Sequence, residues 1–181
     1  GAKAASVHPL FAISGGGSAQ AKIGSALFTL EGDESALATV SALLDVCGVH
    51  HREIASSDKP LYHAAAVCAS NLAVGLFAGA QTMLERCGFG ADEARGALRP
   101  LFVANCESIA ERGPIDALTG PIERNDAETV AGHLMAFRED PTLLKERDAY
   151  TALSRVAVEV AAAKHPERDY SHIAEILRAA R

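Results

Sequence analysis

The segment Lys59–Asn71 (KPLYHAAAVCASN) sets His63, Ser70 and Asn71 into a pattern that is otherwise apolar and helical. Ser70 and Asn71 follow His63 by seven and eight positions, about two helical turns, so an unbroken helix would place all three on one face. An imidazole can donate or accept a proton near neutral pH, and an amide can orient a carbonyl or hydroxyl group. The spacing predicts either a ligand site or a set of hydrogen bonds between packed helices.

A second candidate site follows the turn Thr119-Gly120-Pro121, which leads into a predicted helix start beside Arg124. Backbone N–H groups at a helix N-terminus, together with a guanidinium group, suit a carboxylate or a phosphate. The alternative is a capped helix start with a solvated Arg124. His133, about two turns further along, has the position of an ordinary packed or exposed side chain.

Other histidines and glycines carry weaker signals. His8 ends the first predicted strand, and strand ends in α/β folds commonly face ligand clefts. His50 and His51 are adjacent on a strand and point to opposite faces, so they predict no metal site. The cluster 15–17 fails the dinucleotide pattern G-x-G-x-x-G, because Gln20 stands where its last glycine belongs, and it predicts a flexible loop. The sequence also lacks a P-loop, a G-x-S-x-G elbow and an H-E-x-x-H helix.

Composition restricts the class of protein. The 181 residues suffice for one domain, alone or with a short appendage, and the net charge of -6 argues against a nucleic-acid surface. No apolar run approaches the roughly 20 residues of a membrane span, so we expect a chain that does not enter a membrane. The four cysteines have no C-x-x-C pairing and no signal peptide precedes them, which predicts buried thiols and a cytoplasmic location. They are Cys47, Cys68, Cys87 and Cys106.

The elements that must position these residues change in type near residue 56. Residues 1–56 read as a small α/β segment, with strands at 5–10, 26–31 and 49–54 and a helix at 34–47 capped by Asp33. Residues 57–181 read as an all-helical domain. The fold class is therefore mainly α, preceded by a small α/β segment.

The helical domain begins with a predicted helix over 61–86 that is apolar nearly all round, which implies burial on most sides and pairing with a second copy as a homodimer. The next helix, 91–112, should be kinked at Pro100 and end at Gly113-Pro114. Asn125 is the expected cap of a helix to about 138, and Asp140 that of a helix to 164. A last helix is expected over 171–180.

Several strings, in order, resemble the Rossmann-like DUF2520 family over about residues 5–160. They are Ser6-Val7-His8-Pro9-Leu10, Leu30-Glu31-Gly32-Asp33, Tyr62-His63-Ala64-Ala65-Ala66-Val67 with Ala69-Ser70-Asn71, and Ala117-Leu118-Thr119-Gly120-Pro121-Ile122 with Arg124, Asp126 and Thr129-Val130. Members of this family look like NAD(P)-dependent oxidoreductases related to pyrroline-5-carboxylate reductase, ketopantoate reductase and 6-phosphogluconate dehydrogenase. The resemblance implies an N-terminal dinucleotide-binding domain followed by a helical domain of the 6-phosphogluconate dehydrogenase C-terminal-like type.

In that family the Gly-rich cofactor fingerprint lies upstream of the His-Pro-Leu strand. The resemblance therefore implies that this chain is the end of a Rossmann-like domain plus the helical substrate and dimerisation domain of a longer protein, which uses NADP or NAD on a small carbonyl, imine or hydroxyl compound. Of the family's substrate residues, an asparagine is matched by Asn71. For such a site we expect His8 near the nicotinamide, His63 as proton donor or substrate binder, and Ser70 and Asn71 as groups that orient the substrate. Thr119 and Arg124 would contact a substrate anion.

One position departs from the relatives. They carry a lysine one turn before the asparagine that matches Asn71, and here that position is Val67. The departure favours an alternative function, a non-catalytic helical dimerisation or ligand-sensing module.

Overall fold

The computed structural model describes residues 1–11, 23 and 26–180, so the predicted glycine loop at 15–17 lies outside the described residues. The chain divides into two compact units, Gly1–Ala73 and Val74–Arg181. The described chain is mainly helical, with one small sheet near its N-terminus, which confirms the predicted fold class. Strands give way to helices near residue 56, where the sequence predicts a domain boundary. The boundary itself stays a prediction.

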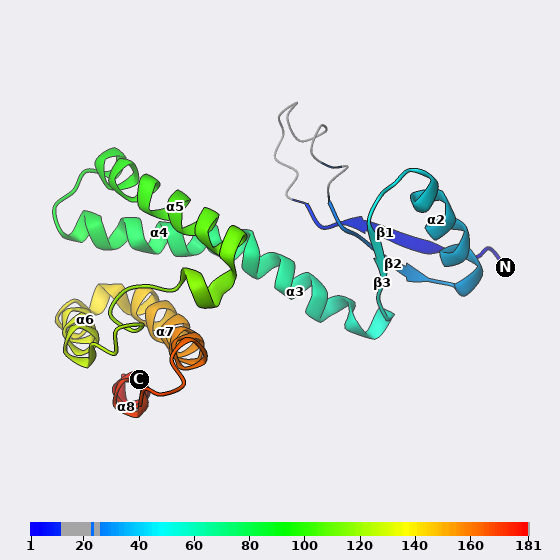
Figure 1. Ribbon diagram of the computed structural model, residues 1–181. Helices are drawn as coiled ribbons and strands as arrows, with labels where there is room; N and C mark the ends of the chain where they lie inside the picture. Colours follow the sequence, from blue (N-terminus) through cyan, green and yellow to red (C-terminus); the bar gives the residue numbers. More distant parts are fainter. Residues whose placement is uncertain (12–22, 24–25, 181) are drawn as a thin grey trace. The chain divides into compact units, whose positions relative to one another are not determined.

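The N-terminal unit is built on a three-stranded sheet in the order β1-β2-β3. Its strands are β1 (Ala5–Pro9), β2 (Phe28–Gly32) and β3 (His51–Glu53). β1 is antiparallel to β2, while β3 is parallel to β2 because helix α2 (Glu34–Val46) forms the crossover between them. Figure 1 shows α2 lying beside the sheet, whose central residue Leu30 is fully buried. The strands and the helix expected in this segment are all present, with somewhat shorter bounds.

Asp33 stands at the N-cap of α2 as predicted, but its carboxylate does not bond to the helix. It accepts a hydrogen bond of 2.9 Å from the Ala4 backbone N–H and lies 3.6 Å from Lys3 Nζ. The neighbouring Gly32, at φ 144°, lets the first residues of the chain pass close by, because a Cβ there would lie 2.3 Å from the Ala4 carbonyl oxygen. Asp33 therefore fastens the N-terminal arm to the sheet.

The single helix expected over 61–86 is two helices. A 3-10 turn, η2 (Ser56–Asp58), leads into α3 (Lys59–Ala69), and α4 (Asn71–Arg86) follows. The break falls at Ser70, which has φ -126° and ψ -79°. Its hydroxyl donates to the Ala66 carbonyl oxygen at 2.7 Å, a local bond that competes with regular helix geometry. The prediction of one unbroken helix from His63 through Asn71 is therefore wrong, because Asn71 begins a second helix.

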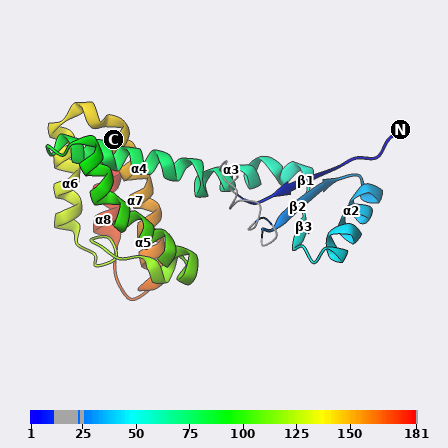
Figure 2. The same cartoon turned by 90° about the horizontal axis from the view of Figure 1, so that it is seen from above.

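The C-terminal unit has its core among three helices that lie side by side in Figures 1 and 2. Its elements after α4 are α5 (Ala91–Ala117), α6 (Ala127–Glu139), the 3-10 turn η3 (Pro141–Leu143), α7 (Leu144–Lys164) and α8 (Ser171–Ala179). The core comes from α6, α7, α8 and the segments that precede α6 and α8. It consists of Ile122, Val130, Leu134, Ala161, Tyr170, Ile173 and Leu177.

The helix ends of this unit follow the predicted signals with two corrections. α5 loses helical geometry at Gly113 (φ 77°), as expected, whereas Pro100 keeps helical dihedrals. The cap of α6 is Asp126, because Asn125 has φ 58° and lies outside the helix start. Asp140 accepts a 3.0 Å hydrogen bond from the Thr142 N–H, as a cap should, but a 3-10 turn separates it from α7.

The apolar helices in the middle of the chain are exposed, contrary to the expected burial. Among the residues that the structure describes, α3 and α4 contain no buried side chain, and α5 contains only Ala94 and Ala117. Leu61, Val74 and Leu101 are each 70% exposed or more. The four cysteines, predicted to be buried, are also exposed. Apolar surfaces of this size are unusual on a monomeric soluble protein.

The stretch Ser56–Arg86 also corrects the expectation that no apolar segment has the length of a membrane span. By length and composition it could cross a membrane. Core helices of soluble proteins pass the same test. The finding adds a membrane, beside a protein partner, to what could cover the exposed side of these helices.

Candidate functional site

A cluster of His8, Tyr62 and His63 joins the sheet to the start of α3. His8 lies near the end of β1, and its Nδ1 is 3.0 Å from Tyr62 Oη. The two rings meet edge to face with their centroids 5.8 Å apart, and the His63 ring lies 6.5 Å from that of His8. The structure therefore brings together two residues that the sequence proposed separately and adds Tyr62, which sequence reasoning missed.

Both His8 and the start of α3, which carries Tyr62 and His63, are held by contacts with the sheet. His8 stands opposite the buried Thr29, whose hydroxyl donates to the His8 carbonyl oxygen at 3.2 Å. At the start of α3, Lys59 Nζ pairs with the Glu31 carboxylate and donates to Ser6 Oγ at 3.2 Å. The hydrogen bond from Lys59 lowers the pKa of Glu31, so the carboxylate stays ionised and the pair stays formed. These contacts fix α3 against the strands that carry His8.

The cluster offers donors and acceptors to a small polar ligand. His8 and His63 are exposed, and Tyr62 is half-buried. Two imidazoles and a phenol can donate hydrogen bonds to a carbonyl oxygen or an anion, and an imidazole can also transfer a proton near neutral pH. Tyr62 precedes His63 in the sequence, but its partner His8 is 54 residues away, which no spacing rule reveals.

Ser70 and Asn71 lie at the break between α3 and α4. Ser70 Oγ is 3.0 Å from Asn71 Oδ1, in addition to its bond to Ala66. Both residues are exposed, and in the described part of the chain no hydrogen bond joins either of them to His63. Their predicted role in orienting a substrate stays a prediction.

The C-terminal unit carries the second candidate site on the loop 118–126. Gly120, at φ 94°, and Asn125 allow the chain to fold back, so that the Arg124 N–H donates to the Gly120 carbonyl oxygen at 3.1 Å. Ile122 anchors the loop in the core. Thr119 and Arg124 both remain exposed on it.

The segment 164–170, which we call the clasp, holds this loop in place. Its contacts are Lys164 Nζ to the Leu118 carbonyl oxygen (2.8 Å), His165 Nε2 to Glu123 Oε1 (2.5 Å), Arg168 Nη1 and Tyr170 Oη to the Glu123 carbonyl oxygen (3.0 and 2.9 Å), and Asn125 Nδ2 to the Asp169 carbonyl oxygen (2.9 Å). Most of them end on backbone carbonyls, which the sequence cannot reveal as partners. Sequence reasoning therefore missed the clasp.

The N-terminus of α6 is already occupied by an anion of the protein itself. Asp126 accepts hydrogen bonds from the Thr129 N–H at 3.0 Å and from Thr129 Oγ1 at 2.7 Å, and these bonds lower the pKa of its carboxyl group. An external anion would therefore meet the side chains of Thr119 and Arg124 rather than the helix end. His133 is exposed and its Nδ1 lies 2.9 Å from Tyr150 Oη, which fits the ordinary exposed side chain that was one of the two expectations for it.

Glu123 makes the stability of the C-terminal unit depend on pH. The hydrogen bond with His165, aided by the nearby charges of Lys164 and Arg168, lowers the pKa of Glu123. A carboxyl group with a lower pKa in the folded state stabilises the fold above its unfolded pKa, and this contribution is lost as the pH falls below about 4.5.

We therefore expect Glu123→Gln to flatten the fall in unfolding free energy between about pH 6 and about pH 3, as measured by urea denaturation at each pH. Glu128→Gln, on the exposed face of α6, is the matched control and should keep the wild-type slope. Equal slopes for wild type and Glu123→Gln would show that the bond between Glu123 and His165 contributes nothing to stability.

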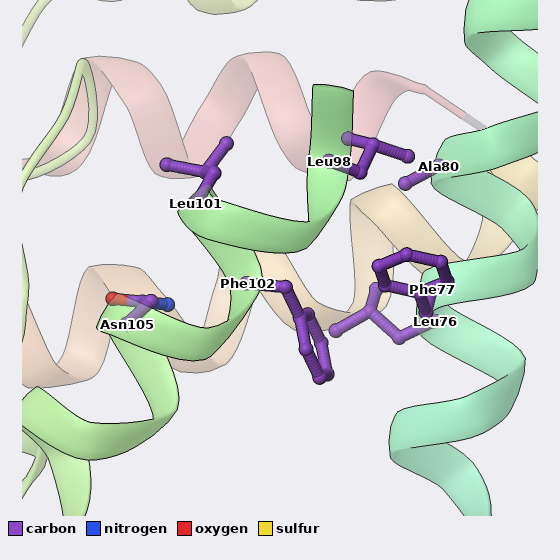
Figure 3. Close-up of a pocket in the computed structure, with 7 residues that line it drawn as sticks. All are labelled: Leu76, Phe77, Ala80, Leu98, Leu101, Phe102 and Asn105. Atoms are coloured by element: carbon purple, nitrogen blue, oxygen red, sulfur yellow. The ribbon is translucent and has the colours of Figure 1, made fainter. Parts of the chain in front are cut away.

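A hollow between α4 and α5 is lined mainly by apolar side chains (Figure 3). Phe77 and Phe102 meet there edge to face, with ring centroids 5.1 Å apart. The hollow is lined by Leu76, Phe77, Ala80, Leu98, Leu101, Phe102 and Asn105. Its lining suits an apolar side chain better than a polar substrate.

Comparisons with known proteins identify a family and a similar solved structure. A family model described as "Domain of unknown function (DUF2520)" matches residues 26–157, a range that ends before the clasp. The crystal structure of protein TM1727 from Thermotoga maritima is similar, with a TM-score of 0.73 and 25% identity. The similarity covers 88% of this chain and 62% of the Thermotoga chain. No curated protein matches significantly.

Proposed function

Because the chain belongs to the DUF2520 family, whose model matches residues 26–157, we propose that it forms the substrate-binding and dimerising part of an NAD(P)-dependent oxidoreductase. The substrate class is a small carbonyl, imine or hydroxyl compound. The cluster of His8, Tyr62 and His63 carries the proposal, because it places proton-transferring groups where a strand ends beside a helix start. The nicotinamide chemistry comes from the family resemblance alone.

Within this proposal, His63 donates a proton to the substrate oxygen or nitrogen, or binds it. Ser70 and Asn71 orient the substrate, and Thr119 and Arg124 contact an anionic group on it. The exposure of Thr119 and Arg124 and the fixed loop that carries them support this last role, since a guanidinium group on a rigid loop loses little entropy on binding an anion.

The residues of this chain do not make a complete dinucleotide site. The sequence contains no G-x-G-x-x-G turn of the kind that holds a pyrophosphate at a helix N-terminus. We therefore assign to this chain only a contact between His8 and the nicotinamide end of NADP or NAD. The chain spans 62% of the Thermotoga protein, so the activity of a whole protein of that length belongs to the proposal.

Dimerisation is supported by the exposed apolar surface of α4 and α5. Side chains such as Leu72, Val74 and Leu101 are more than half exposed. Complete burial of such a side chain from full exposure is worth about 1.5–3 kcal/mol, and covering the exposed part of each would supply a fraction of that. A homodimer with a two-fold axis covers this surface on both copies with one contact.

His63→Ala is expected to weaken substrate binding or turnover without unfolding the protein. The residue is exposed on the first turns of α3, so its loss removes a polar group without leaving a cavity. A loss of about 100-fold in kcat/KM is the usual scale for a proton donor. The measurement is steady-state kinetics of the intact protein that the proposal assumes, beside circular dichroism of the variant.

His172→Ala, a substitution of another exposed histidine on α8, is the matched control and should leave kinetics unchanged. Wild-type kinetics in His63→Ala would remove His63 from the proposed site.

The alternative function is a non-catalytic dimerisation or ligand-sensing module. Val67, at the position of the relatives' lysine, favours it, since an aliphatic side chain cannot donate a proton. Under this alternative the protein would bind a small molecule without any turnover of a nicotinamide nucleotide.

A further inference from the structure

The contact between His8 and Tyr62 allows two protonation patterns. Either Tyr62 donates its hydroxyl proton to Nδ1 of His8, or Nδ1 carries a proton and donates to the phenolic oxygen. A phenol O–H is the stronger donor, and a neutral imidazole nitrogen is the stronger acceptor. The first pattern leaves the His8 proton on Nε2, the nitrogen that faces away from Tyr62.

We propose that Tyr62 is a positioning residue that accounts for the orientation of His8, holding Nδ1 as an acceptor so that Nε2–H is presented to the ligand. The proposal rests on the role of His8 in the proposed function. Tyr62 itself needs no contact with substrate, because it acts through the ring of His8.

The surroundings of Tyr62 suit this role. The Tyr62 ring is half-buried and meets His8 edge to face, so the contact restricts the imidazole ring as well as its proton. The backbone of His8 is held independently by Thr29, and α3 is held by the pair of Lys59 and Glu31. With the backbone of His8 and the start of α3 both held, the hydrogen bond and the edge-to-face contact restrict the orientation of the His8 ring.

The test is nitrogen-15 NMR of the imidazole side chains in the whole 181-residue chain, with His8 assigned from His8→Gln. In the wild type we expect one tautomer of His8, with the proton on Nε2. In Tyr62→Phe, which keeps the ring and removes the hydroxyl group, we expect the Nδ1 signal to move and average between tautomers.

The chain supplies a matched control in the pair of His133 and Tyr150, which has the same contact at 2.9 Å. Tyr150→Phe should change the His133 signals and leave those of His8 as they are. Unchanged His8 signals in Tyr62→Phe, or a wild-type proton on Nδ1, would overturn the proposal.

A second readout separates this inference from the proposed function. If His8 takes part in turnover, Tyr62→Phe should change the pH dependence of kcat. Tyr150→Phe should change kcat several-fold less at each pH. If the NMR change occurs but His8→Gln leaves turnover intact, Tyr62 still fixes the His8 tautomer, and it is the role of His8 in the proposed function that fails.

Discussion

Leu177→Ala is expected to lower the free energy of unfolding of the C-terminal unit by about 2–5 kcal/mol. Leu177 is fully buried on α8, in the core formed with α6 and α7. The substitution removes apolar contact and leaves a cavity where neighbouring side chains cannot collapse completely. Urea denaturation followed by circular dichroism measures the change.

Leu153→Ala makes the same chemical change at a residue of α7 that is 49% exposed. It should cost less than about 1 kcal/mol. A similar loss for both variants would mean that α8 does not form the core described here.

Leu101→Glu is expected to convert a dimer into a monomer. Leu101 is 70% exposed on α5. It belongs to the apolar surface that the described part of this chain leaves uncovered. Because a two-fold interface contains the residue twice, the substitution should weaken the dimer by about 3 kcal/mol or more, roughly a hundredfold in Kd. Sedimentation equilibrium at micromolar concentration measures the change.

Leu153→Glu introduces the same charge at an exposed leucine of α7 and should leave the dimer intact. A wild-type chain that sediments as a monomer would remove the homodimer from the proposed function. Binding of that monomer to lipid vesicles would assign the apolar surface of Ser56–Arg86 to a membrane instead.

The sequence predicted the element order well because turn and cap signals are local. Gly113-Pro114 interrupts α5 where expected, and the bounds of α7 and α8 agree with the prediction to within a few residues. The errors arise where two adjacent residues offer the same local signal. Asn125 and Asp126 are both good caps, and only the left-handed backbone of Asn125 selects Asp126.

Long-range contacts account for what the sequence did not predict at the candidate sites. Tyr62 pairs with a residue 54 positions away, and the clasp reaches Glu123 from more than 40 positions away. The break at Ser70 also depends on a side-chain bond to Ala66 that competes with the helix. The apolar composition on all sides of the segment 61–86 indicated a continuous buried helix there, but composition does not report what covers a surface.

The central claim is that this chain serves nicotinamide-dependent chemistry on a small substrate. Its most direct test is calorimetric titration of NADPH and NADH into the protein purified from its source and, separately, into this 181-residue chain. The account predicts that the protein from its source binds one of the two nucleotides, and that this chain alone, which lacks the G-x-G-x-x-G turn, does not. A source protein that binds neither nucleotide would contradict the claim and favour the ligand-sensing module.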